Sequence, residues 1–450
     1  MSSFILACLL LIPAQCQAEA GKDESRFTLT VIHTNDLHSH DEPFMYKGKL
    51  TGGMARLATV IADMKKASKN VVVVDAGDIF QGSPLYSRYL GEVEVNLLNM
   101  AGYDVYTLGN HEFDNGASNT ARQMKNARFD IINCNLDMKK VPALDQLVKP
   151  YVVKEFGKQK VAFVGAITPE LELLSSSLEG ARLKAKGDNW IEPIKNQVDE
   201  LTKTGFDKIV LVSHCGLDQE KKLARAIPKV DAIIGGHSHT RLDKRVIVDH
   251  DDGTTTTIVQ TGCYGRALGK LDLVFDKEGL VDVKASRYRL YDIHEKIAEV
   301  PSIKAYVEKK MVPLLTLRQK MVGFASQEFG PKITPSDSPM GDLICDALIE
   351  SGKEYGATLA LHNRGGTRGV LEKGPISLAD VEQILPFDNY LVFATITGTT
   401  LNHALEHAVG GSIGGRFLDV GGIKFAYDKS KSRGKRLIFV RIKNKDGSWS

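Results

Sequence analysis

The sequence predicts an α/β protein in which a large layered domain is followed by a smaller α/β domain. Between residues 27 and 239, short β-branched apolar runs alternate with stretches whose apolar positions recur at helical spacing. Such alternation is typical of a sheet covered by helices. A glycine-free, helix-forming stretch near residue 310 separates this region from a second set of elements. We therefore predict a domain at residues 25–298, a helical connector at 299–320 and a second domain at 321–450.

The first domain is predicted to alternate strands and helices along the chain. Val71–Val74 is a run of four valines and predicts a buried strand, whereas Met54–Lys66 has apolar residues at helical spacing. The predicted strands are residues 27–32, 71–74, 105–107, 130–132, 161–165, 208–212 and 231–234. The predicted helices are residues 54–66, 93–100, 190–203 and 221–227. Neighbouring strands in this arrangement are expected to run parallel, with their carboxyl ends at one edge.

The chain changes character after residue 245. Residues 246–291 are rich in threonine, glycine and alternating apolar residues, which predicts antiparallel strands that close the first domain. Residues 301–320 predict the connecting helix, and Pro313 is expected to kink it because proline lacks a backbone donor. In the second domain, residues 340–351 predict a helix, residues 363–369 a glycine-rich loop and residues 437–442 a strand.

Composition excludes some classes of partner. The 450 residues are 43% hydrophobic and 25% charged, which is ordinary for a globular protein. Lys and Arg number 58 against 55 Asp and Glu, and a net charge of +3 is too balanced to indicate nucleic-acid or membrane-surface binding. The sequence leaves the oligomeric state open.

The first 20 residues are predicted to be a signal peptide. Residues 4–12 form a short apolar core, and small residues follow at Ala18 and Ala20. The core is too short to span a bilayer as a helix, and no later stretch is long and apolar enough to do so. Lipid attachment at Cys16 is disfavoured because Pro-Ala-Gln precedes it. We therefore expect a periplasmic or secreted protein without an integral membrane segment.

Four cysteines remain after that segment, and their spacing is too wide for a disulfide scaffold or a zinc knuckle. They are Cys134, Cys215, Cys263 and Cys345. Buried free thiols and a disulfide bridge are both compatible with this spacing, and three pairings are possible.

Polar metal-ligand residues follow five of the predicted strands. They are Asp36, His38, Asp78, Asn110, His111, His214, His237 and His239. The carboxyl ends of parallel strands meet at one edge of a sheet, where open α/β folds bind ligands. Aspartate, histidine and the asparagine carbonyl oxygen all coordinate divalent metals, and the set is large enough for two ions. Two metals about 3.5–4 Å apart assist displacement at phosphorus, so we predict a dimetal phosphoester site.

The motifs Asp36-x-His38, Gly77-Asp78, Gly109-Asn110-His111-Glu112 and Gly236-His237-x-His239 resemble the calcineurin-like metallophosphoesterases. The residues around Asp36 and Asn110 look like the 5′-nucleotidase branch, which includes the bacterial periplasmic UDP-sugar hydrolases. The resemblance implies a four-layer α/β/β/α metallophosphoesterase domain followed by a smaller α/β substrate-binding domain.

The resemblance also assigns the ligands. It implies one metal held by Asp36, His38, Asp78 and His239. It implies a second metal held by Asp78, Asn110, His214 and His237, with Asp78 as the bridge. His111 and Asp114 would form a catalytic dyad beside them. Zn, Mn, Co and Fe all accept this mixture of ligands, so the identity of the metals stays open.

In the second domain the resemblance implies a nucleotide site. Asn363, Arg368 and Phe387 match positions that contact nucleotide in the family, with the phenylalanine stacking on the base. Arg364 stands where the family usually has glycine, and we expect it to supply a charge to the substrate. The sequence given ends before the family's terminal Gly-Gly-Asp-Gly-aromatic segment, so this domain is expected to be a shortened one.

Three functions are compatible with these features. The first is an exported dimetal hydrolase of nucleoside 5′-monophosphates, with UDP-sugars and other nucleotide pyrophosphates as further candidate substrates. The second is a 2′,3′-cyclic-nucleotide phosphodiesterase with 3′-nucleotidase activity, or the related sulfur-oxidation thiohydrolase. The third is a weakly catalytic surface protein that binds nucleotides. Of these we predict the first, because the residues around Asp36 and Asn110 resemble the 5′-nucleotidase branch. The intact metal ligands argue against the third function but do not separate the first from the second.

Overall fold

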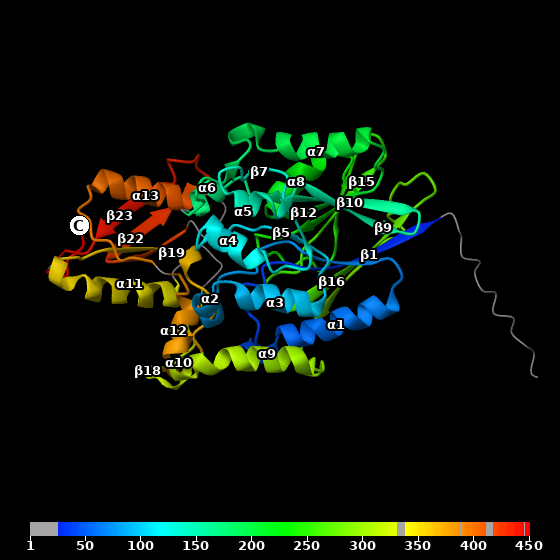
Figure 1. The fold of residues 1–450 in the computed structure, drawn as a ribbon. Helices are drawn as coiled ribbons and strands as arrows, with labels where there is room; N and C mark the ends of the chain where they lie inside the picture. The colour runs from blue at the N-terminus through cyan, green and yellow to red at the C-terminus, as the bar shows by residue number, and fades with distance from the viewer. Residues whose placement is uncertain (1–25, 176, 331–337, 388, 411–416, 445) are drawn as a thin grey trace, which may run out of the picture.

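Two β-sheets packed face to face form the centre of the first domain (Figure 1). The computed structural model describes residues 26–175, 177–330, 338–387, 389–410, 417–444 and 446–450. The predicted signal peptide lies outside the described residues. The apolar core between the sheets includes Val31 and Val74 from one sheet and Phe163 and Val212 from the other. All four side chains are fully buried.

The first sheet has seven strands in the order β17-β16-β1-β4-β5-β6-β8. They are β1 (Phe27–Thr34), β4 (Val71–Asp75), β5 (Val105–Thr107), β6 (Asp130–Ile132), β8 (Val148–Lys149), β16 (Ala267–Phe275) and β17 (Arg287–Asp292). The strands from β1 to β8 run parallel, whereas β16 pairs antiparallel with both β1 and β17. The predictions for β5 and β6 are confirmed to the residue, and those for β1 and β4 to within two residues.

The second sheet has six strands in the order β14-β15-β13-β12-β10-β9. They are β9 (Tyr151–Phe156), β10 (Gln159–Ile167), β12 (Ile209–His214), β13 (Ala232–Gly235), β14 (Val246–Asp249) and β15 (Thr255–Val259). One expectation for residues 246–291 is wrong, because β15 pairs parallel with β13. The chain crosses from β13 to the sheet edge, forms β14 there, and reverses in a hairpin that inserts β15 between them.

Helices cover the outer face of each sheet. Those of the first domain are α1 (Met54–Ala67), α2 (Pro84–Tyr89), α3 (Glu92–Ala101), α4 (Ala117–Met124), α5 (Pro142–Asp145), α6 (Leu171–Leu174), α7 (Glu192–Lys203) and α8 (Leu217–Ala226). Figure 1 shows α7 on one side of the paired sheets and α1 and α3 on the other. The predicted four-layer α/β/β/α arrangement is therefore confirmed.

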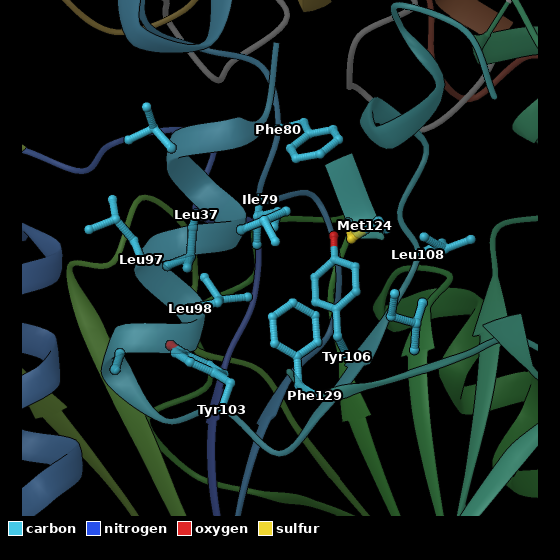
Figure 2. Packing of buried hydrophobic residues seen from close by; sticks show 14 of the residues in the cluster. Leu37, Ile79, Phe80, Leu97, Leu98, Tyr103, Tyr106, Leu108, Met124 and Phe129 are labelled. Carbon is cyan, nitrogen blue, oxygen red and sulfur yellow. The ribbon is translucent and has the colours of Figure 1, made fainter. Parts of the chain in front are cut away.

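The largest apolar cluster lies between the first sheet and its helices. Figure 2 shows Leu98 of α3 on the side of the helix that faces Tyr106 of β5 and Phe129, whereas Leu97 points to the other side. The Tyr106 ring contacts the Phe129 ring, with centroids 5.7 Å apart. This cluster supports the loops that follow β4 and β5, and those loops carry Asp78 and Asn110.

The connector is helical but broken at the predicted place. It contains α9 (Pro301–Met311), a 3-10 turn at Val312–Leu314 that includes Pro313, and α10 (Leu315–Gln319). Proline at the turn cannot donate to the preceding carbonyl, which accounts for the break. Helix α9 packs on the first domain through Ile303 and Val307.

The C-terminal domain follows and lies at one end of the first domain (Figure 1). Its helices are α11 (Pro339–Ser351), α12 (Leu378–Ile384) and α13 (Gly398–Gly410). Its strands pair two by two: β18 (Met321–Ala325) with β20 (Gly374–Ser377), β19 (Ala360–Asn363) with β21 (Leu418–Gly421), and β22 (Ile423–Tyr427) with β23 (Leu437–Ile442). The predictions for α11 and β23 are confirmed, and the glycine-rich loop begins at the end of β19 with a 3-10 turn at Arg364–Gly366.

Candidate metal centre and active site

Strand ends from both sheets deliver the predicted metal ligands. Strands β1, β4 and β5 are neighbours in the first sheet, and β12 and β13 are neighbours in the second. Asp36 lies two residues after β1, and Asp78 and Asn110 each lie three residues after their strands. His214 ends β12, and His237 lies two residues after β13. The candidate ligands therefore come from both sheets of the sandwich.

Five of the seven candidate ligands have left-handed backbone conformations. They are Asp36 (φ 53°), His38 (φ 48°), Asp78 (φ 59°), His237 (φ 73°) and His239 (φ 52°). Such conformations are uncommon for residues with a side chain, and they persist where the surrounding structure enforces them, often at functional sites. Two backbone hydrogen bonds fix the loops here: Asp36 N donates to Gly77 O at 2.9 Å, and His38 N donates to Asp78 O at 3.0 Å.

One group of candidate ligands comprises Asp36, His38 and His239, whose ligand atoms all lie within 4.8 Å of one another. His239 Nε2 is 3.2 Å from Asp36 Oδ1 and 3.0 Å from His38 Nε2. Asp36 and His38 are buried, whereas the His239 side chain is 31% exposed. The side-chain amide of Asn35 donates to Asp36 Oδ2 at 2.6 Å and so orients that carboxylate.

A second group comprises Asp78, His214 and His237, within the same distance of one another. His214 Nε2 is 3.0 Å from Asp78 Oδ2, and its Nδ1 lies 2.6 Å from the carbonyl oxygen of Ala76, which fixes the ring. Asn110 Oδ1 is buried without a hydrogen-bond partner in the described part of the chain. A buried carbonyl oxygen of this kind needs a partner, and a cation is one that asparagine accepts.

Asp78 lies between the two groups. Its Oδ2 is 3.8 Å from His38 Nε2 as well as 3.0 Å from His214 Nε2. Its Oδ1 accepts a hydrogen bond from the backbone N–H of His111 at 2.9 Å. A Cβ at Gly109 would lie only 2.1 Å from Asp78 Oδ1, so only glycine fits there. This placement suits a carboxylate shared by two metals, and the donor set as a whole fits divalent cations.

Glu112 supports this centre, a role that was not predicted from the sequence although the residue belongs to the Gly109-Asn110-His111-Glu112 motif. Its buried carboxylate accepts backbone hydrogen bonds from Asp78, Ile79, Phe80 and Gly109, at 2.6 to 3.2 Å. Burial raises the pKa of Glu112 to about 7. One carboxylate thus ties the loop after β4 to the loop after β5. The only signal in the sequence was an acidic residue directly after His111.

Glu220 has a similar role in the second sheet. It accepts a hydrogen bond from Gly236 N at 3.2 Å and another from the Gln260 side-chain amide at 2.7 Å. These contacts fix the turn that presents His237. The motif search missed this residue because it lies in helix α8, 16 residues before that turn.

His111 and Asp114 form the predicted pair. His111 Nδ1 lies 2.7 Å from Asp114 Oδ2, so the ring can donate its Nδ1 hydrogen to the carboxylate. Burial opposes charging of the ring, but the carboxylates of Asp114 and Asp78 outweigh it and raise the pKa of His111 above its ordinary value. The ring centroid of His111 is 5.2 Å from that of His38.

Two residues of the C-terminal domain reach this pair. Arg368 Nη2 lies 3.4 Å from His111 Nε2, and the Phe387 ring centroid lies 5.6 Å from that of His111. The Arg368 guanidinium in turn lies 5.0 Å from the centroid of the Phe387 ring. The predicted substrate residues Arg368 and Phe387 therefore lie beside the candidate metal centre.

Arg364 and Asn363 have different surroundings. The buried Arg364 guanidinium donates to Asp419 Oδ1 from Nε at 3.0 Å and also from Nη2, and it lies 4.4 Å from the centre of the Phe417 ring. Its charge is thus paired with a carboxylate of β21. Asn363 ends β19 and is exposed. A role of either side chain in binding substrate stays a prediction.

The four cysteines are free and buried in the structure, so the alternative of a disulfide among them is not observed. No helix in the described part of the chain combines the length and apolar character needed to cross a bilayer.

Comparisons with known proteins agree with this geometry. Residues 29–241 match the calcineurin-like phosphoesterases, and residues 321–447 match the C-terminal domain of 5′-nucleotidases. The snake venom 5′-nucleotidase of Naja atra is 31% identical over an alignment that covers 92% of this chain and 85% of the relative. The chain belongs to the 5′-nucleotidase family. As a member of the 5′-nucleotidase family, it is a metal-dependent phosphoester hydrolase.

Solved structures support the same family. The 5′-nucleotidase precursor of Thermus thermophilus has a TM-score of 0.88 at 31% identity, covering 94% of this chain and 87% of that one. The sulfate thiohydrolase SoxB of the same species has a TM-score of 0.74 at 18% identity, covering 92% and 86%. At that identity the likeness concerns the fold alone. The predicted family, fold class and enzyme class are therefore confirmed.

Proposed function

We propose that this 5′-nucleotidase family member is an exported dimetal hydrolase that releases phosphate from nucleoside 5′-monophosphates. The observation that carries the proposal is the meeting of Arg368 and Phe387 with His111, beside two groups of metal-ligand atoms. A guanidinium and an aromatic ring beside these ligand atoms support the binding of a phosphate and its nucleoside there.

The proposed metal ligands are those implied by the sequence. Asp36, His38, Asp78 and His239 would hold one cation, and Asp78, Asn110, His214 and His237 the other. The unpartnered Asn110 Oδ1 supports this assignment. Two divalent cations, when bound, stabilise the attacking and leaving oxygens of a displacement at phosphorus and make water a better nucleophile near neutral pH.

His111 is proposed to donate a hydrogen bond to a phosphoryl oxygen. Asp114 accepts from Nδ1, which leaves Nε2 free to face the substrate and favours the protonated ring. Arg368 Nη2 is a second donor 3.4 Å away, so both groups can donate to one anion lying between them. Donors fixed before the reaction stabilise charge that develops in the transition state.

Phe387 is proposed to contact the nucleoside. Stacking of a base on an aromatic ring is worth about 1–3 kcal/mol in nucleic-acid binders, enough to select nucleotides over simple phosphate esters. Asn363 and Arg364 are also proposed to contribute to nucleotide binding. The charge of Arg364 is paired with Asp419, so Arg364 would act by shaping its loop.

UDP-sugars and other nucleotide pyrophosphates are proposed as further substrates, since the proposed base and phosphate contacts make no demand on the group beyond the phosphate. The proposal of export rests on residues 1–20, which have the pattern of a signal peptide. The cyclic-nucleotide and thiohydrolase alternatives share the metal ligands, and contact of Phe387 with the His111 pair favours a nucleotide over a sulfur substrate.

A phosphate-release assay on purified protein tests the proposal. The protein is stripped with EDTA and reloaded separately with Zn²⁺, Mn²⁺, Co²⁺ or Fe²⁺, then offered AMP, 3′-AMP, 2′,3′-cyclic AMP, UDP-glucose and a small aryl phosphate. We expect no turnover after stripping, and the highest kcat/KM for a 5′-nucleotide after reloading. Preference for the cyclic or 3′-nucleotide, or full activity without metal, would overturn the proposed function.

A further inference from the structure

Residues 260–262 begin the connection between the two sheets, at the edge where the candidate metal ligands lie. They follow β15 of the second sheet and precede β16 of the first sheet. Gln260 lies in this segment, and Asn35 directly precedes the candidate ligand Asp36. The side chains of Gln260 and Asn35 are fully buried, and neither is a candidate metal ligand. A buried amide needs hydrogen-bond partners, and both amides find them around the ligands.

The Gln260 side chain holds the turn that carries two candidate ligands, His237 and His239. Its Nε2 donates to the carbonyl oxygen of Gly236 at 3.1 Å, and its Oε1 accepts from Thr240 N at 3.2 Å. These two contacts lie on either side of the two histidines in sequence. One amide therefore fixes the turn at both ends.

The other two hydrogen-bonding positions of the Gln260 amide are also used. Its Nε2 donates to Glu220 Oε2 at 2.7 Å, and its Oε1 accepts from Ser238 Oγ at 3.1 Å. An amide has two donor hydrogens and one oxygen with two lone pairs, so the Gln260 side chain is fully satisfied. A carboxylate of the same size would instead place an acceptor against the Glu220 carboxylate. The contacts therefore require an amide at position 260.

Asn35 forms a matching set of contacts beside the end of β1. Its Nδ2 donates to Asp36 Oδ2 at 2.6 Å and to the carbonyl oxygen of Gly262 at 2.7 Å. Its Oδ1 accepts from Thr261 N at 2.9 Å and from Thr261 Oγ1 at 2.8 Å. The Asp36 carboxylate is thus tied, through Asn35, to the two residues that follow Gln260 in the chain.

We propose that Gln260 is a positioning residue for both metals, and that residues 260–262 fix Asp36 relative to His237 and His239. The two sets of contacts also meet directly, because His237 N donates to Asp36 Oδ2 at 2.9 Å. The inference rests on the proposed dimetal function, in which the two histidines belong to different metals. Displacing their shared turn should therefore affect both sites, whereas displacing Asp36 should mainly affect one. Hydrogen-bond partners of metal ligands typically contribute about 10- to 100-fold to metal affinity.

Mn²⁺ binding to the metal-stripped full chain, measured by calorimetry, tests the proposal. The titrations use two backgrounds that each retain one candidate site: His237→Ala retains the site that contains His239, and His239→Ala retains the other. Adding Gln260→Met should weaken Mn²⁺ about 10- to 100-fold in both backgrounds. Adding Asn35→Ala should weaken Mn²⁺ more in the His237→Ala background than in the other, because that background retains the site of Asp36.

An exchange of the amide and the carboxylate separates positioning from packing. Gln260→Glu hardly changes the size of the side chain but turns its donor into an acceptor, so Mn²⁺ should bind more weakly in both backgrounds. Adding Glu220→Gln restores a donor opposite that acceptor, and the new amide oxygen can still accept from Gly236 N. The exchanged pair should therefore recover part of the lost affinity, which a role in packing alone does not predict.

Two further variants complete the design. Gln123→Met is the matched control, because Gln123 is a buried glutamine of α4 whose amide contacts Asn119 of the same helix, and both Mn²⁺ affinities should stay unchanged. Ser238→Ala removes a single contact of Gln260 at an exposed residue and should weaken Mn²⁺ by less than Gln260→Met. If Gln260→Met does not fold, Ser238→Ala decides, and unchanged affinity in both backgrounds would overturn the inference.

Three other results would also overturn it: equal Mn²⁺ affinity with and without Gln260→Glu, a loss in only one background, or no recovery when Glu220→Gln is added. A parent chain that binds no Mn²⁺ overturns the proposed function together with the inference. A parent chain that binds two ions with affinities indifferent to Gln260 overturns the inference alone.

Discussion

His111 is the residue at which the parts of the candidate site meet. Its backbone N–H donates to Asp78, its Nδ1 faces Asp114, and its Nε2 lies 3.4 Å from Arg368 Nη2. His111 therefore contacts the Asp78 carboxylate through its backbone, and Asp114 and the C-terminal domain through its side chain. The proposed role of His111 requires the ring to be protonated when substrate is bound.

Asp114→Asn should change the pH dependence of the reaction. Asp114 raises the pKa of His111, so its removal lowers that pKa. Activity that needs the protonated ring is present below the pKa of His111 and is lost as pH rises through it. The alkaline limb of kcat/KM, measured across pH with saturating metal, should therefore move to lower pH in the variant. An unchanged profile would remove Asp114 from the proposed role.

Glu112→Gln should loosen the loops that carry the ligands. Glutamine offers one acceptor oxygen where the carboxylate offers two, and its amide hydrogens face backbone N–H groups. A buried donor left without a partner costs about 1–3 kcal/mol, so the free energy of unfolding should fall by about that amount. Denaturant unfolding and metal content by elemental analysis measure the effect. Glu155→Gln, an exposed substitution on β9, is the control, and equal behaviour of the two variants would contradict this account.

At the scale of elements, most strands of the first domain could be predicted because their signal is local. Val105–Thr107 and Asp130–Ile132 are short β-branched or apolar runs, and both become strands with the predicted limits. The parallel pairing of β15 could not be predicted, since its partner is chosen by the path of the chain across the sheet edge. The break at Pro313 was predictable because it follows from proline itself.

The link between the glycine-rich loop and β21 was not predictable either. Arg364 was expected to supply a charge to the substrate, but its guanidinium is paired with Asp419, 55 residues away in sequence. A partner so distant in sequence produces no local sequence pattern around Arg364 from which the pairing could be predicted. Gly341 packs directly against the Asp419 carboxylate. A Cβ at position 341 would lie 2.2 Å from the carboxyl carbon of Asp419, so a larger residue would not fit.

Asp419→Ala should therefore destabilise the C-terminal domain. Removing one partner of a buried ion pair leaves the other charge uncompensated, which costs about 3–5 kcal/mol. The side chains of Arg364 and Asp419 are 8% and 4% exposed. Thermal unfolding followed by calorimetry should show a lower transition for that domain, and KM for AMP should rise while metal content stays the same. Glu354→Ala, an exposed substitution in the same domain, should have neither effect.

At the scale of the whole molecule, the candidate site combines residues from both sheets and from both domains. The meeting of the candidate metal ligands was predictable because each lies at or after a strand end, and strand ends of an α/β fold meet. The supporting roles of Glu112 and Glu220 were not predicted, because a carboxylate that accepts backbone hydrogen bonds need not stand at a fixed sequence distance from the metal ligands. The resemblance predicted that Arg368 and Phe387 bind nucleotide. Their contact with His111 depends on how the two domains pack, which residue spacing does not show.

Phe387→Ala tests the contribution of the second domain. If the ring binds the base, the variant should raise KM for AMP by about 5- to 150-fold, corresponding to the loss of about 1–3 kcal/mol of stacking. Hydrolysis of a small aryl phosphate, which lacks a base, should be nearly unchanged. Steady-state kinetics on both substrates with saturating Mn²⁺ measure the difference. Equal losses on the two substrates would show that Phe387 supports the structure instead.

The central claim is that Asp78 lies between two cations held by the ends of β1, β4, β5, β12 and β13. X-ray diffraction from crystals grown with Mn²⁺, recorded near the manganese absorption edge, tests it most directly. We predict two anomalous peaks about 3.5–4 Å apart, one on each side of the Asp78 carboxylate. A single peak, or no peak within reach of His214 and His239, would contradict the account.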